Sequence, residues 1–160
     1  MRSIMVAIQP QWAELIFRGS KTREIRKTLP NDDEPFKAYV YVTLKHPLWI
    51  RFGMPNEILS GKVVGEFVCK EFDRFFWNER SEFVNDIRKK AQLSFDEMKR
   101  YAGSSDTLFG WHIDDVKEYD QPLEIRHFLD NKGIPMKRPP QSWQYVIPRY
   151  FMDAKAGLKT

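Results

Sequence analysis

The chain has 160 residues, of which 42% are hydrophobic, 14% aromatic and 30% charged. This length and composition predict one globular domain with a sizeable core, and they exclude a disordered chain. Lysine and arginine total 26 against 22 acidic residues, a formal charge of +4 that permits a nucleic-acid or phosphate partner without requiring one. We expect a single domain over residues 1–148 and a basic C-terminal tail over residues 149–160.

Cysteine and histidine usage argues against disulfide and metal chemistry. Cys69 is the only cysteine, so an intrachain disulfide is impossible, and its place in an apolar strand predicts a buried, inert thiol. His46, His112 and His127 show no metal-ligand spacing, and we expect neither a metal nor a cofactor. The N-terminus turns polar by Gln9, too early for a signal peptide, and no apolar run approaches the ~20 residues of a membrane span. We expect a soluble, cytoplasmic protein.

The N-terminal segment predicts a strand followed by a short helix. Ile4, Val6 and Ile8 alternate with their neighbours, which is typical of a buried strand. Pro10 fits the first turn of a helix, and Gly19 suits the left-handed position that closes one. The helix is barely two turns long, so tertiary packing must stabilise it.

The charged stretch after this helix predicts a short strand with a single apolar residue, Ile25. Side chains two apart in a strand share a face, about 6–7 Å apart. If the apolar residue points into the core, the opposite face carries Thr22, Glu24 and Arg26, and Lys21 lies at its entrance. Two interpretations are open at this point: a solvated strand face with a weak surface ion pair, or a carboxylate held between two cations to bind a polar ligand.

Two clear strands are predicted over residues 38–44 and 61–69. The alternation of apolar residues is strongest in the first of them. The second is apolar on both faces, which indicates a central strand or one in a closed barrel. Strict alternation places Val64 and Phe67 on opposite faces, and Gly65 is expected to mark a bend or bulge.

The apolar period then becomes helical. Phe83 and Ile87 are four residues apart, which predicts a helix, and Ser94 with Glu97 forms the S-x-x-E capping box that starts another. We interpret the basic residues of this region, Arg100 among them, as a solvated helix face; contact with a phosphate backbone is the alternative.

The C-terminal part predicts a strand pair or one bent strand over residues 108–119, a helical turn opened by Pro122, and a last strand with Trp143, Tyr145 and Ile147 on one face. Short helices between about five strands, without a βαβ rhythm, argue against a doubly wound sheet. The predicted fold is α+β: a small, mostly antiparallel β-barrel with short helices inserted around it. The sequence lacks the GxGxxG, Walker A, nucleophile-elbow and HExxH motifs.

Four stretches in order carry a family resemblance: G-x-K-x-x-E-x-R at 19–26, G-K-V-V-G-E-F at 61–67, Y-D-x-P-L at 119–123 and P-P-Q-S-W at 139–143. They resemble motifs of bacterial and phage ASCH domains, the activating-signal-cointegrator homology group of the PUA-like superfamily. The resemblance covers nearly the whole chain.

The resemblance implies a PUA-like barrel with a cleft beside the G-x-K-x-x-E-x-R turn, and RNA, single-stranded nucleic acid or a modified nucleoside as the partner. The expected ligand-binding residues are then Lys21, Thr22, Glu24, Arg26, Gln141, Ser142 and Trp143. Lys21 and Arg26 can neutralise a phosphate or polarise a carbonyl, and Glu24 can accept from a base N–H. Trp143, Tyr41 and Trp111 either offer a stacking face or pack in the core.

An enzymatic role is left open. Some small ASCH proteins resemble amidohydrolases acting on N4-acylated cytidine through a Lys, Thr and Glu triad, and others cut single-stranded RNA. Lys21 matches that lysine, but Glu24 stands in place of the threonine, so the acyl-transfer route lacks its hydroxyl nucleophile. Lys21 and Glu24 remain candidates for general acid–base catalysis. The preferred function is a binding module; the alternatives are a small hydrolase and a phage-type protein that binds a host protein.

Overall fold

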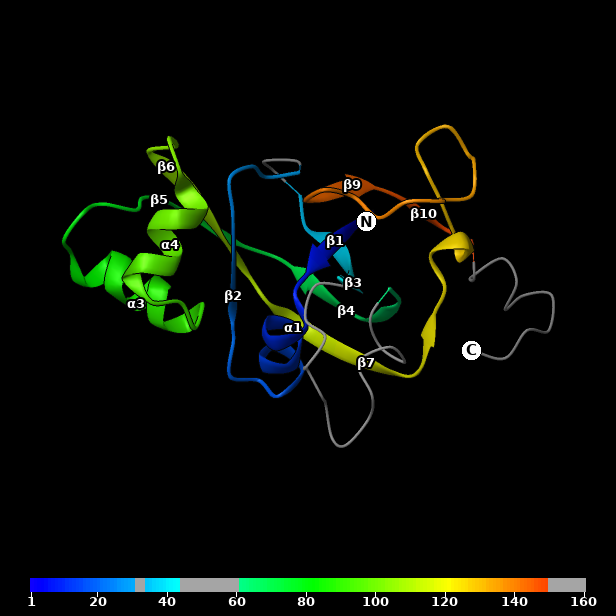
Figure 1. Ribbon diagram of the computed structural model, residues 1–160, viewed down its shortest axis with the longest axis horizontal. Coiled ribbons are helices and arrows are strands. Elements are labelled where there is room, and N and C mark those ends of the chain that lie inside the picture. The colour runs from blue at the N-terminus through cyan, green and yellow to red at the C-terminus, as the bar shows by residue number, and fades with distance from the viewer. Residues whose placement is uncertain (31–33, 44–60, 150–160) are drawn as a thin grey trace.

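The computed structural model describes residues 1–30, 34–43 and 61–149, and its largest sheet has five strands (Figure 1). In spatial order, these strands are β7 (Asp114–Leu123), β4 (Val63–Cys69), β3 (Phe36–Val42), β1 (Arg2–Ile8) and β9 (Trp143–Tyr145). β1 and β3 are parallel, and the other neighbours are antiparallel.

A second sheet has the order β2-β6-β5. Its strands are β2 (Arg23–Arg26), β6 (Thr107–His112) and β5 (Phe72–Phe76), and a two-stranded sheet pairs β8 (Phe128–Leu129) with β10 (Ile147–Pro148). The helical segments within the described chain are α1 (Pro10–Phe17), α3 (Glu82–Lys90), α4 (Phe95–Ala102) and the 3-10 turn η1 (Ile125–His127).

The α+β class and the mostly antiparallel pairing are confirmed, but the expected closed barrel is not. β7 and β9 are the two edges of the five-stranded sheet, and β2 belongs to a different sheet. The reason lies at Ile113, the single residue between β6 and β7. On one side of it the chain pairs with β2 and β5, and on the other side it pairs with β4, so this nearly continuous strand links two sheets and does not close one.

The local predictions for the helices are largely confirmed. α1 carries Pro10 in its first turn, and Gly19 behind it has φ +82°. The capping box of α4 forms, since Ser94 and Glu97 each accept a hydrogen bond from the other's backbone N–H. Pro122, however, does not open the helical turn: it lies in β7, an edge strand, where a missing N–H can face away from the ladder.

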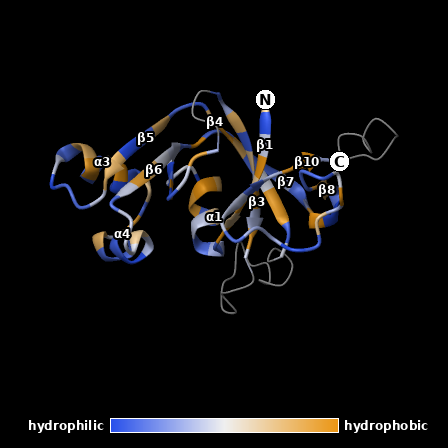
Figure 2. Ribbon diagram, turned by 90° about the horizontal axis from the view of Figure 1, so that it is seen from above, coloured by the Kyte–Doolittle hydropathy of each residue, from blue (hydrophilic) through white to orange (hydrophobic). Residues whose placement is uncertain are grey.

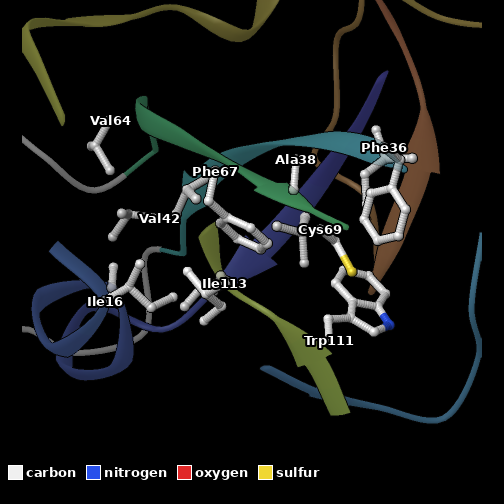
Figure 3. Packing of buried hydrophobic residues seen from close by; sticks show 14 residues of the cluster. Ile16, Phe36, Ala38, Val42, Val64, Phe67, Cys69, Trp111 and Ile113 are labelled. Atoms are coloured by element: carbon white, nitrogen blue, oxygen red, sulfur yellow. The ribbon is translucent and has the colours of Figure 1, made fainter. Parts of the chain in front are cut away.

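Two apolar cores cover the faces of the five-stranded sheet. Along β3, Ala38 and Val40 enter one core, and Tyr39 enters the other. The prediction of strict alternation in β4 is wrong at Val64, which joins Phe67 in the first core (Figure 3). The register between β3 and β4 shifts next to Gly65, opposite Val40, so the expected bulge moves Val64 to the other face.

The first core also holds Cys69, beside Trp111 (Figure 3). Its thiol is buried, as expected, and burial raises its pKa to about 12, which disfavours the reactive thiolate. Trp111 packs edge-on against Phe36, with 5.1 Å between the ring centroids.

A third core lies between the three-stranded sheet and the helices α3 and α4, which lie at the same end of the molecule as β5 and β6 (Figure 2). Val84 and Ile87 point into this core, whereas Phe83, four residues before Ile87 in the helical period, is 53% exposed. Ile25 of β2 enters the same core, so the neighbouring charged residues of β2 face the opposite way.

In the described chain, no helix has the length and apolar composition needed to cross a membrane. Residue 44 of the predicted second strand and residues 150–160 of the expected tail lie outside the described residues.

Gly65 allows α1 to pack tightly against β4 and β7. A Cβ at this position would lie 2.5 Å from the Lys117 carbonyl oxygen and 2.6 Å from the Phe17 ring. We expect Gly65→Ala to lower the free energy of unfolding by about 1–3 kcal/mol through overpacking, as measured by urea denaturation. Gly110→Ala is the control, because its Cβ would meet only side-chain atoms and at longer distances: the Ile87 methyl at 3.3 Å, the Ile25 methyl at 3.6 Å and the Asp73 carboxylate at 3.7 Å. An equal loss in both variants would contradict this interpretation.

Candidate functional site

Strand β2 presents an ion pair on the face opposite Ile25. Glu24 and Arg26 are two residues apart and share this face. Arg26 donates to the Oε2 atom of Glu24 from both Nε, at 2.8 Å, and Nη2, at 2.6 Å. Both residues are buried, with 6% and 8% of their surface exposed, so the interpretation as a solvated strand face is wrong.

The second cation comes from the turn between α1 and β2. The backbone N–H groups of Ser20 and Lys21 both donate to the Leu15 carbonyl, which closes the turn behind the helix. The Lys21 ammonium then lies 3.4 Å from the other carboxylate oxygen of Glu24, Oε1. It is only 2% exposed. The carboxylate therefore has one cation on each of its two oxygens.

The turn is tied to the C-terminal end of α3. Lys21 Nζ donates to the Ala91 carbonyl at 2.7 Å, and the Thr22 N–H donates to the Lys90 carbonyl at 2.8 Å. The last carbonyls of a helix lack partners within it and carry a partial negative charge. An ammonium and a backbone N–H therefore satisfy this helix end and at the same time hold the turn in place.

Arg26 ties β2 to the five-stranded sheet. Its Nη2 donates to the Ala7 carbonyl at 2.8 Å, and its Nη1 donates to Ser142 Oγ at 3.0 Å. Ser142 directly precedes β9. One guanidinium thus joins β2, β1 and the segment before β9, which come from three distant parts of the chain.

Burial and charge act in opposite directions on the two titratable groups. Burial by itself would raise the pKa of Glu24, but the Arg26 and Lys21 charges outweigh it and hold that pKa below its usual value of 4.5. Burial lowers the pKa of Lys21 from its usual 10.5, against the opposing effect of the Glu24 charge. Glu24 is therefore ionised at neutral pH, and Lys21 gives up its proton more readily than an exposed lysine.

The three charged groups lie at the floor of a cleft of about 590 Å³. The cleft runs along β2, which passes between α1 and α4 (Figure 1). Around β2, the cleft is lined by Gln11 and Trp12 of α1; by Leu93 and by Glu97, Arg100 and Tyr101 of α4; by residues 7–9 at the end of β1 and Thr43 after β3; and by Gln141 before β9. The volume is that of a small-molecule site.

The floor keeps some hydrogen-bonding capacity for a ligand. Of the five N–H groups of Arg26, four make the bonds described above, and one on Nη1 has no partner among the described residues. Lys21 uses two of its three N–H groups, on Ala91 and Glu24. Two residues that line the cleft each have a buried side-chain oxygen, Gln11 Oε1 and Thr43 Oγ1, that forms no hydrogen bond with the described residues.

The structure brings together most, but not all, of the expected site residues. Lys21, Glu24, Arg26 and Gln141 line the cleft, and Ser142 contacts Arg26. The other two expected residues, Thr22 and Trp143, are described by the structure but do not line the cleft. The Trp143 indole instead donates to Thr28 Oγ1 at 2.8 Å and packs 5.3 Å from the Tyr145 ring.

The expected stacking faces are corrected. Trp111 is fully buried and Tyr41 is 5% exposed, and each packs in a core. Among the described residues, the aromatic rings that line the cleft are Trp12 and Tyr101. The sequence indicated Trp12 only as part of an apolar helix stripe, and nothing in it pointed to Tyr101, one residue after the basic Arg100. Within the described residues, no group of three metal-ligating side chains converges.

Comparisons with known proteins show the fold. No family model and no curated protein matches the sequence. The crystal structure of ASCH from Zymomonas mobilis has a TM-score of 0.69 and 16% identity, covering 99% of this chain and 96% of that one. A serine-to-alanine mutant of the same Zymomonas mobilis protein, ZmASCH, gives a TM-score of 0.70 at 16% identity, covering 99% of this chain and 97% of that one. The chain therefore has the ASCH fold.

The buried carboxylate stabilises the fold through its two cations. Glu24→Gln leaves Lys21 and Arg26 buried without a counter-charge, and we expect it to lower the free energy of unfolding at neutral pH by about 3 kcal/mol. Asp86→Asn breaks the exposed pair with Lys90 and is the control, with a much smaller expected effect. The measurement is urea denaturation of the three proteins.

The stabilisation by Glu24 depends on pH. Because the pKa of Glu24 is lowered in the folded state, its contribution to the free energy of unfolding is complete above pH 4.5, its usual pKa, and is lost as the pH falls below that value. The stability difference between wild type and Glu24→Gln should therefore shrink in acid. A difference that stays constant down to about pH 3 would contradict this account.

Proposed function

We propose that this chain, which has the ASCH fold, binds RNA or a modified nucleoside in the cleft beside its G-x-K-x-x-E-x-R turn. The observation that carries the proposal is the Lys21–Glu24–Arg26 group at the floor of that cleft. A role in RNA metabolism or regulation would follow from it.

Fold stability alone is a weak explanation for a buried ion-paired group, because apolar residues of similar volume often stabilise a fold as well or better. This group lies under an open cleft, and a spare N–H on each cation has no hydrogen-bond acceptor among the described residues. Fixed charges in a partly desolvated site interact strongly with a polar ligand. Their position supports ligand binding over a purely structural role.

The rim of the cleft supports a phosphate-bearing ligand. Arg100 is exposed on α4 and lines the cleft, and the Lys27 ammonium lies 5.4 Å from the centre of the Tyr101 ring. The alternative interpretation of the basic helix face, contact with a phosphate backbone, therefore fits Arg100. A cation at the mouth of a cleft attracts a polyanion and makes its affinity depend on salt.

A second candidate is a small hydrolase acting on single-stranded RNA or on a modified nucleoside such as N4-acylcytidine. It is favoured by the Lys21 ammonium, whose pKa burial lowers and which lies 3.4 Å from a carboxylate in the cleft. These are the properties of a lysine that exchanges protons with a substrate. Thr22 does not line the cleft, which leaves acid–base catalysis by Lys21 and Glu24 as the route.

Binding is tested by fluorescence anisotropy with a labelled single-stranded RNA between about 50 and 200 mM salt. We expect the affinity to fall with salt and Arg100→Gln to reduce the slope of log affinity against log salt by about 0.7, the value for one phosphate contact on a single strand. Lys89→Gln removes the same charge from an exposed position outside the cleft and should leave the slope unchanged. Absence of binding to RNA and to nucleosides would refute the proposal.

The hydrolase candidate is tested by mass spectrometry after incubation with acylated nucleosides and with short single-stranded RNA. Product formed by wild type but not by Lys21→Met, with circular dichroism showing both proteins folded, would make this chain a hydrolase. Binding without product in either protein would leave the binding module as the function.

A further inference from the structure

We infer that the floor of the cleft selects an unpaired uracil base, with Glu24 accepting from the ring N–H and the two flanking cations donating to the two carbonyl oxygens. This inference rests on the proposed function, because it names the base that the nucleic-acid cleft would take. Uracil presents its ring N3–H between two carbonyl groups. Its pairing edge therefore has the order acceptor, donor, acceptor.

The floor of the cleft has the complementary order. The Lys21 ammonium lies against Glu24 Oε1 at 3.4 Å, and the Arg26 guanidinium lies against Oε2 at 2.6 Å. The carboxylate stands between them and, being ionised, can only accept. The order across the floor is donor, acceptor, donor.

Each part of the floor has capacity for one more hydrogen bond. Among the described residues, one N–H of Lys21 and one N–H of Arg26 have no hydrogen-bond acceptor, although the Lys21 ammonium also lies 5.4 Å from the centre of the Trp12 ring. Within the described chain, the Glu24 oxygens accept only from Lys21 and Arg26. A carboxylate has about four acceptor sites, so Glu24 can accept one more hydrogen bond. One donor on each side and one acceptor in the middle match the three polar groups of the uracil edge.

The other bases present different orders. Cytosine offers a donor followed by two acceptors, so a ring nitrogen lone pair would face the carboxylate. Guanine offers an acceptor followed by two donors, so its amino group would face a cation. Buried polar groups that are left unpaired discriminate strongly against the wrong ligand. An inorganic anion also fits poorly, because it brings no donor for Glu24.

The walls suit a flat ring. Trp12 and Tyr101 line the cleft from α1 and α4, on either side of β2, and both are anchored in apolar cores. Base–aromatic stacking is tolerant of sequence, so these rings would contribute affinity while the floor contributes the choice of base. A base within a duplex is excluded, because its pairing edge is already occupied.

The test uses full-length protein and single-stranded oligonucleotides of about eight residues, within the site size of single-strand binders. Anisotropy is measured with oligouridylate, oligocytidylate and an oligomer of N3-methyluridine, in which a methyl group replaces the N–H that Glu24 would accept. We expect oligouridylate to bind about tenfold tighter or more than oligocytidylate. The N3-methylated oligomer should bind no better than oligocytidylate. This comparison needs no substitution in the protein.

Two variants separate the walls from the floor. Tyr101→Leu should weaken the binding of uridylate and cytidylate by the same factor, and Tyr101→Phe should retain both affinities. Equal affinity for uridylate and cytidylate, or no effect of N3-methylation, would overturn the inference and leave the proposed RNA binding intact. Absence of binding to every oligomer would overturn both.

Discussion

The structure depends on a carboxylate buried between two cations. Glu24 would be costly to bury alone, and the same holds for Lys21 and Arg26. Together they are stable because each remaining polar contact is made by a different part of the chain: the end of α3, strand β1 and the segment before β9. The ion-pair network therefore adds a second link between the two larger sheets, beside the continuous β6–β7 segment, and a ligand that binds it meets groups already held in place.

Fold and site are linked through the edge strand β2. A four-residue strand has little stability of its own, and β2 is held by β6 on one side and by Arg26 on the other. Ile25 anchors one face in the core beneath α3 and α4, which leaves the charged face to form the floor of the cleft. The cleft exists because β2 lies between two helices instead of continuing the five-stranded sheet.

Local signals in the sequence predicted the parts of this arrangement that depend on neighbouring residues. The two-residue period around Ile25 placed Glu24 and Arg26 on one face, and the spacing of Ser94 and Glu97 predicted the start of α4. The far wall of the cleft could not be predicted, because Tyr101 reaches it through packing about 75 residues along the chain from β2. Strand alternation also failed to separate core from surface aromatics, since both faces of the five-stranded sheet are buried.

The central claim is that the charged cleft is the binding surface, and an NMR titration of isotope-labelled protein with single-stranded oligouridylate tests it most directly. The account predicts chemical-shift changes clustered in residues 21–26, at the floor of the cleft, and in residues 97–101, along one wall. Exposed phenylalanines at Phe76, Phe83 and Phe95 offer a different surface. Shifts clustered there, with residues 21–26 unchanged, would contradict the account.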